Sequence, residues 1–436
     1  MNQKRVLILT YYWPPSGGAG VQRWLKFVKY LRGFGWEPIV YTPENPEFPE
    51  VDESLYGDVP ENLSIVRTPI TEPYSAYKTL IGRKKGEKIS PGFLSEKKRN
   101  PLAENLSVWI RGNFFIPDAR MFWIRPSVKF LLSYLKEKPV DIIISTGPPH
   151  SLHIIGMKVS KVLGIPWIAD FRDPWTNIDF YRDLKLTGWA DRRHHKLELK
   201  VLSNASAITV ISNSMADDFR KMHDRKYDVI TNGYDTDDLL KDEAVETDLK
   251  FSISYIGTMV SRRNPVSFWK AIHSLVEENE AFRNDLLIRL VGKTDYSVMD
   301  TVSQLGLTGF IDRVNYLPHR DVVKIQRQSQ VLLLVINDSQ NAKMILTGKI
   351  FEYMAAQRPI ICIGTVDGDA GKILADTNSG MIAGFSDPQR VKEIILGYYT
   401  KFKAGNLISG SRNIEDYSRK ALTGKLAKVM DSLVQK

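Results

Sequence analysis

Short apolar runs alternate with amphipathic stretches along most of the chain. Residues 6–10 form a run rich in β-forming side chains, and residues 21–32 then carry apolar side chains at helical spacing. Apolar strands that alternate with helices are typical of parallel sheets covered on both faces, so the pattern predicts an α/β fold. Further strands are expected at residues 38–42, 64–67, 140–145, 166–170, 207–211, 228–231, 251–256, 286–291, 313–316, 331–336, 359–363 and 381–383.

The alternation pauses at residues 232–250, which are polar and acidic. We interpret this segment as an interdomain linker, with a solvated surface loop as the alternative. The alternation then restarts, which predicts two successive α/β domains, residues 1–240 and residues 241–410. Residues 414–434 have a helical pattern, so residues 411–436 are expected to hold a C-terminal helix that can pack back on the first domain.

Composition and charge narrow the class of protein. The 436 residues carry a net charge of +10, which favours anionic partners such as phosphates, nucleic acid or a membrane surface. The single cysteine, Cys362, excludes an intrachain disulfide and favours a reducing cytoplasm. The apolar runs are far shorter than the roughly 20 residues of a membrane-spanning helix. The N-terminal run lacks the features of a signal peptide, so we expect a cytoplasmic protein whose membrane contact is at most peripheral.

Most of the excess positive charge lies in one segment. Residues 82–125 contain ten Lys or Arg and four Asp or Glu, with aromatic residues between them. A basic segment with aromatic side chains can bind the anionic inner face of the cytoplasmic membrane. The alternative is a charged surface insertion whose aromatic residues pack on the first domain. We do not expect nucleic-acid binding, because the charge is concentrated in this insertion and no nucleic-acid module is present.

Three loops that follow expected strands carry candidate phosphate ligands. Gly17 and Gly18 lie between a strand and a helix, where backbone N–H groups can approach an anion closely. This loop matches neither the dinucleotide fingerprint nor the P-loop, and a tight turn without ligand is the alternative. Arg262 and Arg263 follow the first strand of the second domain and have the planar fork that suits phosphate oxygens, although a solvated pair fits nearly as well. Lys349 is expected in the first turn of a helix, where it opposes the helix dipole unless a diphosphate shares the site.

Glu352 lies three residues after Lys349 and is expected near the same helix face, where it can accept hydrogen bonds from a ribose diol. A capping box does not explain this glutamate, because with Thr347 as N-cap the third helical position is Ile350.

Candidate catalytic residues lie in two loops of the first domain. Residues 145–153 and 169–175 both follow expected strands, so both loops should emerge at the carboxyl edge of the sheet, where open α/β sheets bind ligands. Arg172, Asp173 and His150 are the candidates there. His150 and His153 lack a third ligand at a recognisable spacing, so we expect a hydrogen-bonded surface pair and no metal site.

Taken together and in order, these motifs resemble glycosyltransferases of family 4, in the branch that builds bacterial surface polysaccharides. The resemblance covers nearly the whole chain. The motifs that carry it are residues 11–18 (YYWPPSGG), 141–149 (DIIISTGPP), 172–175 (RDPW), 210–214 (VISNS), 231–234 (TNGY) and 348–356 (GKIFEYMAA).

The resemblance implies the GT-B fold, in which two Rossmann-like, doubly wound domains face each other across a cleft. It implies that Glu352 binds the ribose of the donor. Many family members carry a second glutamate eight positions earlier, and this chain has Met344 there. The position of the family's N-domain histidine also does not align cleanly with His150 or His153.

The resemblance implies sugar transfer of the hexosyltransferase type. A nucleotide-diphosphate sugar would be the donor, and a saccharide or polyprenyl-linked lipid the acceptor, in cell-envelope polysaccharide synthesis with retained configuration. No cofactor or metal is required, because fixed cations and backbone N–H groups can stabilise the diphosphate leaving group. The alternatives are a nucleotide-sugar epimerase on the same fold and a non-catalytic accessory protein of GT-B type.

Overall fold

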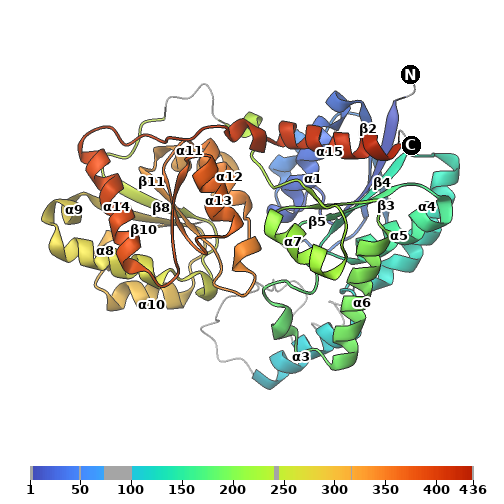
Figure 1. Cartoon of the computed structure of the whole chain (residues 1–436), viewed down its shortest axis with the longest axis horizontal. Helices are drawn as coiled ribbons and strands as arrows, with labels where there is room; N and C mark the ends of the chain where they lie inside the picture. Colours follow the sequence, from blue (N-terminus) through green and yellow to red (C-terminus); the bar gives the residue numbers. More distant parts are fainter. Residues whose placement is uncertain (1–2, 49–50, 73–100, 240–244, 316, 435–436) are drawn as a thin grey trace. The chain divides into compact units, whose positions relative to one another are not determined.

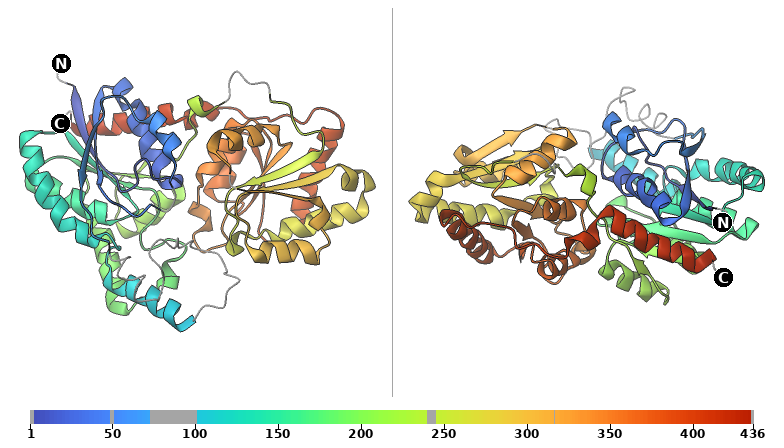
Figure 2. Two further views of the ribbon diagram at one scale, coloured as in Figure 1. Left: turned by 180° about the vertical axis from the view of Figure 1, so that it is seen from behind. Right: turned by 90° about the horizontal axis from the view of Figure 1, so that it is seen from above.

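The computed structural model describes residues 3–48, 51–72, 101–239, 245–315 and 317–434. The described chain forms two compact units, each built on one parallel sheet with helices on both faces (Figures 1 and 2). The first unit runs to Thr231 and takes in the C-terminal residues from Arg419, and the second spans Asn232 to Ser418. The sequence placed the division at residue 240. The segment after Thr231 joins the second unit because Tyr234 is buried in that unit's core.

The first unit contains a seven-stranded sheet in the order β3-β2-β1-β4-β5-β6-β7, with every neighbouring pair parallel. Its strands are β1 (Lys4–Leu9), β2 (Trp36–Pro43), β3 (Ser64–Thr68), β4 (Ile142–Gly147), β5 (Trp167–Phe171), β6 (Ala207–Val210) and β7 (Asp228–Val229). Its helices are α1 (Ala19–Leu31), α3 (Pro101–Phe114), α4 (Ile124–Glu137), α5 (Ser151–Leu163), α6 (Gly188–Asn204), α7 (Asn213–Met222) and α15 (Arg419–Val434).

The second unit contains a six-stranded parallel sheet in the order β10-β9-β8-β11-β12-β13. Its strands are β8 (Phe251–Ile256), β9 (Leu286–Val291), β10 (Ile311–Val314), β11 (Val331–Val335), β12 (Ile360–Ile363) and β13 (Gly380–Ala383). Its helices are α8 (Val266–Glu278), α9 (Glu280–Asp285), α10 (Tyr296–Gln304), α11 (His319–Gln328), α12 (Gly348–Ala355), α13 (Asp369–Asp376) and α14 (Pro388–Lys403). The α/β fold with two Rossmann-like domains is thereby confirmed.

The C-terminal helix α15 packs on the first unit, alongside α1 (Figure 1). Leu422, Leu426 and Met430 are buried in the same core cluster as the α1 side chains. At the far end of the helix, Asp431 accepts a hydrogen bond from Trp36 Nε1 at 3.2 Å and forms an ion pair with Lys4 at 2.7 Å. These contacts attach α15 to the first two strands of the first sheet, β1 and β2.

Asp170, at the end of β5, is a buried hub of the first unit. Its carboxylate accepts hydrogen bonds from Arg23 Nη2 at 2.8 Å and from Trp24 Nε1 at 2.8 Å. Thr146 and Thr209, on the two flanking strands, also donate to it. The Arg23 guanidinium and these donors hold the pKa of Asp170 below its ordinary value in spite of burial. The carboxylate is therefore structural, because every neighbour it binds belongs to the sheet or to α1.

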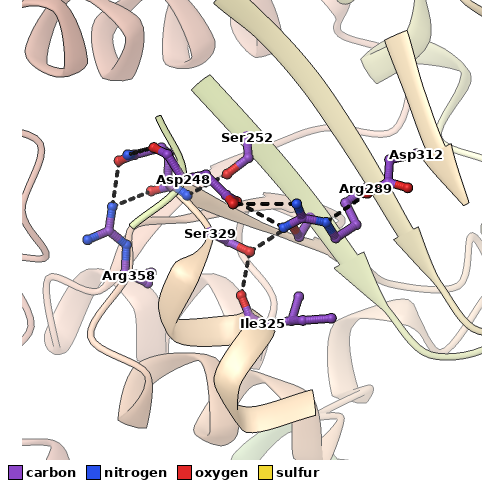
Figure 3. Close-up of polar contacts among 9 residues, drawn as sticks. Asp248, Ser252, Arg289, Asp312, Ile325, Ser329 and Arg358 are labelled. Atoms are coloured by element: carbon purple, nitrogen blue, oxygen red, sulfur yellow. Dashed lines mark hydrogen bonds and ion pairs between the residues drawn. The ribbon is translucent and has the colours of Figure 1, made fainter. Parts of the chain in front are cut away.

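A polar network joins residues near the amino ends of neighbouring strands in the second sheet (Figure 3). Asp248 forms an ion pair with Arg289 at 2.9 Å, and its carbonyl oxygen accepts from Gln330 Nε2 at 2.6 Å. Arg358 Nη2 donates to Gln330 Oε1 at 2.8 Å, and Ser252 Oγ accepts from Gln330 N. The end of the acidic segment that we interpreted as a linker is thus fastened to the sheet. The opposite, carboxyl edge of this sheet carries the candidate site.

No helix in the described part of the chain is both long enough and apolar enough to cross a membrane.

Candidate functional site

Lys349 lies in the first turn of α12, as the sequence predicted, and reaches the end of β8. Its Nζ stands 4.5 Å from the centroid of the Tyr255 ring and 3.3 Å from the Tyr255 hydroxyl oxygen. Gly257, which follows β8 with φ at +115°, makes this approach possible. A Cβ at that position would lie 2.5 Å from Nζ and 2.8 Å from Cε of the lysine. The strand end therefore holds the ammonium group at the carboxyl edge of the sheet.

The start of α12 offers further groups to an anion. Thr347 is the N-cap residue, but its side chain caps no backbone N–H group. Its Oγ1 is buried and has no hydrogen-bond partner among the described residues. The first N–H groups of a helix carry partial positive charge, and Lys349 adds a full charge beside them. Glu352 lies on the same helix and is half-buried. This arrangement suits a diphosphate bonded to a ribose.

The two adjacent arginines after β8 differ in their surroundings. Arg263 donates from Nε to Asn337 Oδ1 at 2.5 Å and from Nη1 to the Thr258 carbonyl oxygen at 3.4 Å. Because Asn337 follows β11, this guanidinium joins the ends of two neighbouring strands. Arg262 is exposed. Arg263 thus has a positioning role at the strand ends, and the role of either arginine toward phosphate remains a prediction.

The glycine loop of the first unit lies at the start of α1. Gly17 is buried, whereas Gly18 is exposed, has φ at +86° and is the N-cap residue of α1. Arg172 Nη1 donates to the carbonyl oxygen of Gly20 at 2.8 Å, and its Nη2 donates to the Pro148 carbonyl oxygen. Arg172 therefore brings the loops after β1, β4 and β5 together. The sequence predicted that the loops after β4 and β5 emerge at one edge of the sheet, and the structure adds the glycine loop to them.

Glu198 of α6 positions the loop that follows β5. This buried carboxylate accepts hydrogen bonds from the backbone N–H groups of Trp175 and Thr176 and from the Thr176 hydroxyl. Next to it, burial raises the pKa of Asp173 to about 6, against the opposing effect of the Arg172 charge. A carboxyl group whose pKa is raised toward neutral is suited to acid–base chemistry.

The two histidines after β4 are buried, so the expectation of a surface pair was wrong. The His150 ring stacks on Trp175, with centroids 4.6 Å apart and an angle of 2° between planes. The His153 ring lies 4.4 Å from the Phe171 ring. These aromatic neighbours come from the adjacent loop and strand, and they cover both imidazoles. Burial lowers the pKa of His150 well below its ordinary value, and it lowers that of His153 to about 3, so both rings are neutral.

A cavity of about 260 Å³ opens beside His150, entirely within the first unit. The residues that line it include several rings, two arginines and one carboxylate, namely Tyr12, Arg111, Phe115, Asp118, Arg120, His150, Trp175, Phe180, Tyr181 and His194. Asp118 accepts from the backbone N–H and the hydroxyl of Ser151 and so caps α5. Arg120 pairs with Glu72 at 3.0 Å and lies over the Tyr11 ring. Aromatic faces with few charged groups are suited to binding a sugar.

Several of these residues escaped sequence analysis. Tyr255 lies within the buried strand β8, and Asn337 follows β11, a strand that is distant from β8 in the sequence. Glu198 and His194 sit on α6, in a helical pattern that gives no chemical signal. Trp175 Nε1 donates to His194 Nδ1 at 3.0 Å, a contact that only the fold creates. Met344 ends a short helical turn (Ala342–Met344) just before α12, where the resemblance placed the absent glutamate.

Comparison with known proteins agrees with this architecture. Residues 89–238 match the sequence profile described as Glycosyltransferase Family 4. No curated protein matches the chain.

Three solved structures share the fold. WaaG, described as a glycosyltransferase involved in lipopolysaccharide biosynthesis, is 14% identical with a TM-score of 0.54 over 99% of this chain and 97% of its own. A mutant of S. aureus TarM, in complex with Fondaparinux, alpha-GlcNAc-glycerol and UDP, is 11% identical with a TM-score of 0.58 over 98% and 100%. A putative UDP-N-acetylglucosamine 2-epimerase from Listeria monocytogenes is 10% identical with a TM-score of 0.56 over 99% and 97%.

The two Rossmann-like units therefore define a protein of the GT-B class. Within that class, the family profile matches residues 89–238 and supports the resemblance to family 4 over that part of the chain, whereas the solved structures show the shared fold. The profile covers the region that contains the candidate catalytic loops of the first unit. Lys349 and Glu352 of the second unit lie beyond it.

Proposed function

We propose that the protein is a glycosyltransferase that moves a sugar from a nucleotide-diphosphate sugar to a saccharide or lipid-linked acceptor. The placement of Lys349 carries this proposal. Its ammonium group lies over the Tyr255 ring and close to Gly257, and Thr347, the N-cap residue of the same helix, has a buried hydroxyl with no partner among the described residues. A cation and helix N–H groups fixed at one strand end form a site for a diphosphate.

The proposed chemistry follows from the charge that develops during transfer. Cleavage of the sugar–phosphate bond leaves negative charge on the diphosphate while the sugar becomes oxocarbenium-like. Lys349 and the start of α12 stabilise that leaving group, and Glu352 binds the ribose diol. Gly17, Gly18, Arg262 and Arg263 are further proposed phosphate ligands. Because these groups supply fixed positive charge, the proposed reaction needs no resident metal and no cofactor, and it retains the anomeric configuration by analogy with the family.

The acceptor is proposed to bind in the cavity of the first unit. The exposed Phe180 ring on the cavity wall offers a face to a sugar, and the exposed Arg111 offers charge to an anionic group. Asp173 and Arg172 lie in the loop beside it. Because WaaG is described as acting in lipopolysaccharide biosynthesis, we infer a role in cell-envelope polysaccharide synthesis, at the inner face of the cytoplasmic membrane.

A basic aromatic lobe supports contact with an anionic membrane. We define this lobe by exposed side chains on α3, on the turn Tyr181–Leu184 with the residue before it, and on α6: Phe114, Phe180, Trp189, Arg111, Arg182, Arg192 and Arg193. Asn113 fastens α3 to the start of α6, because its Oδ1 accepts from Thr187 N at 2.7 Å. Exposed aromatic rings beside cations suit a lipid–water boundary. The part of the insertion at residues 82–100 lies outside the described residues.

The decisive experiment is a thermal-shift panel of UDP, GDP, dTDP, CDP and ADP, each with and without EDTA. A ligand that binds only the folded state raises the apparent stability by about RT ln(1 + [L]/Kd). We expect one diphosphate to stabilise the protein equally with and without EDTA, and UDP is the first choice because the TarM complex contains it.

Matched variants connect that binding to the site. Lys349→Ala should weaken diphosphate binding by roughly tenfold or more, since a hydrogen bond to a charged group contributes about 1.5–3 kcal/mol. The control is Lys392→Ala. Lys392 lies on α14 of the same unit and pairs with Glu278 on α8, so its removal should leave diphosphate binding unchanged. Equal loss in both variants, or no shift with any diphosphate, would contradict the proposal and favour a non-catalytic accessory protein.

A nucleotide-sugar epimerase is the competing activity, because one structure of the same fold is described as a putative epimerase. An epimerase converts its nucleotide sugar without any acceptor. The protein is incubated with a sugar derivative of the nucleotide diphosphate that stabilises it, with and without a saccharide acceptor. The products distinguish transfer from epimerisation. Free nucleotide diphosphate formed only with acceptor supports transfer, and an altered nucleotide sugar formed without acceptor supports epimerisation.

A further inference from the structure

Two side chains of α6 hold the same residue of the loop after β5. Glu198 Oε1 accepts a hydrogen bond from Trp175 N at 3.1 Å, and His194 Nδ1 lies 3.0 Å from Trp175 Nε1. Side chains four residues apart lie on one face of a helix, so one turn of α6 reaches both the backbone and the ring of Trp175. Trp175 ends the segment that contains the candidate catalytic residues Arg172 and Asp173.

The proton of the His194 ring can be placed from its two partners. An indole N–H group only donates, so His194 Nδ1 accepts from Trp175. Burial lowers the pKa of His194 below its ordinary value, so the ring is neutral at pH 7 and carries its one proton on Nε2. That nitrogen donates to the carbonyl oxygen of Gly112, 3.4 Å away. A ring turned over would put carbon atoms at both places, so only this orientation satisfies both partners.

The Gly112 carbonyl group can accept because it lies in the last turn of α3. The last four carbonyl groups of a helix have no partner within the helix, and α3 ends at Phe114. A Cβ on Gly112 would lie 2.7 Å from Leu186 Cδ2 and 2.9 Å from the Leu184 carbonyl oxygen, so glycine lets this end of α3 approach the segment before α6. The carbonyl oxygen takes the Nε2 proton and thereby leaves Nδ1 as the acceptor for the indole.

We propose that His194 is a positioning residue for sugar transfer, because it sets the direction of the Trp175 ring at the end of the candidate catalytic segment, residues 172–175. The contact with Glu198 fixes only the main chain of Trp175, and it leaves the side chain able to turn about its Cα–Cβ bond. The hydrogen bond to His194 removes that freedom. The effect on transfer rests on the proposed function, whereas the arrangement of the two rings does not.

The direction of the Trp175 ring also sets one wall of the cavity in the first unit. Trp175 stacks on the His150 ring, with centroids 4.6 Å apart and 2° between planes. Both rings and His194 line the cavity. Loss of the His194 contact therefore changes the cavity wall and the end of the catalytic segment together, while Glu198 still holds the loop to α6.

Nuclear magnetic resonance of the full chain tests the arrangement of His194 and Trp175 without any ligand. The ¹⁵N shifts of a neutral imidazole distinguish its two tautomers, and a hydrogen-bonded indole proton resonates downfield of one without a partner. The chain has seven histidines and nine tryptophans, so His194→Asn and Trp175→Phe assign the signals. We expect a neutral His194 ring protonated on Nε2 at pH 7. A His194 ring protonated on Nδ1 overturns the proposal.

Two replacements of His194 separate the contact with Trp175 from the rest of the side chain. The amide of asparagine reaches the level of Nδ1, so His194→Asn keeps an acceptor for the indole. The amide of glutamine reaches the level of Nε2, so His194→Gln keeps only the donor to Gly112. Both variants lose the same imidazole and should have similar melting temperatures. The Trp175 indole proton should keep its shift in His194→Asn and move upfield in His194→Gln.

His195→Asn is the matched control. His195 is the exposed neighbour of His194 on α6, and its Nδ1 lies 3.0 Å from the Asp191 carbonyl oxygen. This variant should change neither the Trp175 signal nor transfer.

Transfer is measured as release of the stabilising nucleotide diphosphate from its sugar derivative in the presence of a saccharide acceptor. We expect it to fall roughly tenfold or more in His194→Gln and to return close to the parent rate in His194→Asn, because a misplaced catalytic segment lowers the rate steeply. The thermal shift with diphosphate should be the same in both variants. Equal transfer in the two variants, or an equal loss in His195→Asn, overturns the proposal. A parent protein that transfers no sugar contradicts the proposed function instead, and the indole signals of the two variants still decide whether His194 holds the Trp175 ring.

Discussion

Arg172 donates a hydrogen bond from Nη1 to the carbonyl oxygen of Gly20, over a distance of 2.8 Å. Its other terminal nitrogen donates to the Pro148 carbonyl oxygen. One guanidinium thereby joins the glycine loop at α1 to the turn that precedes His150. A Cβ on Gly20 would lie 3.3 Å from Nη1, so the absence of a side chain there lets the arginine approach. The glycine loop and the cavity of the first unit share this support.

Arg172→Lys should separate the two loops, because a lysine lacks the planar fork that binds two carbonyl groups at once. We expect sugar transfer to fall by roughly tenfold or more, since small displacements of a catalytic loop have large effects on rate. Transfer is measured as nucleotide diphosphate released in the presence of acceptor.

Arg225→Lys is the control for that variant. Arg225 also donates to carbonyl groups of the first unit, those of Leu202, Ala205 and Ser206, but it lies away from the cavity. Both variants should lose a similar amount of stability, on the order of 1–3 kcal/mol. Only Arg172→Lys should lose activity, and full activity in that variant would exclude a role for the arginine at the site.

Gly257→Ala should disturb the donor site through Lys349. The new Cβ would lie 2.5 Å from Nζ, and φ at +115° is unfavourable for alanine, so strain on the order of 1–3 kcal/mol is expected. Nucleoside diphosphate affinity should fall together with the melting temperature. Gly397→Ala, in α14 with open space around it, should leave affinity intact and raise stability slightly. Unchanged affinity in Gly257→Ala would contradict the placement of the diphosphate beside Lys349.

Much of the fold could be predicted from the sequence, because the central strands such as β4, β8 and β11 are mostly apolar runs and the helices between them carry apolar side chains at helical spacing. Lys349 was placed at its helix start for the same reason. Tyr255 could not be predicted, because its contact with Lys349 joins residues from β8 and α12, far apart in the chain. The burial of His150 was missed because the covering ring, Trp175, comes from another strand's loop.

The pH dependence of Asp173 gives opposite signs for stability and activity. Its pKa is raised to about 6 in the folded protein, so between about pH 4 and pH 6 the folded state binds more protons than the unfolded state. Stability should therefore fall as the pH rises through this window, by roughly 1–2 kcal/mol, because the side chain keeps some contact with solvent. Activity should rise over the same window if the carboxylate acts as a base.

Asp173→Asn removes this titration. The variant should be more stable than the parent at pH 7.5 and equal to it at pH 4, as measured by urea denaturation at both values. Asp217→Asn, an exposed carboxylate on α7, is the control and should show no such difference. A stability difference that is the same at both pH values would mean that Asp173 does not titrate between them.

The basic aromatic lobe should bind vesicles that contain anionic lipid. Phe114 is 64% exposed and Trp189 is 59% exposed, and Arg193 lies over the Trp189 ring at 5.5 Å. Replacement of both rings, Phe114→Ser with Trp189→Ser, removes apolar area that contributes about 1.5–3 kcal/mol per fully buried side chain. Co-sedimentation with phosphatidylglycerol vesicles should fall at least tenfold, and binding of the parent should weaken as salt increases.

Tyr296→Ser, an equally exposed ring of the second unit, should leave binding unchanged. If the double variant and the control bind equally well, the lobe is not the membrane contact.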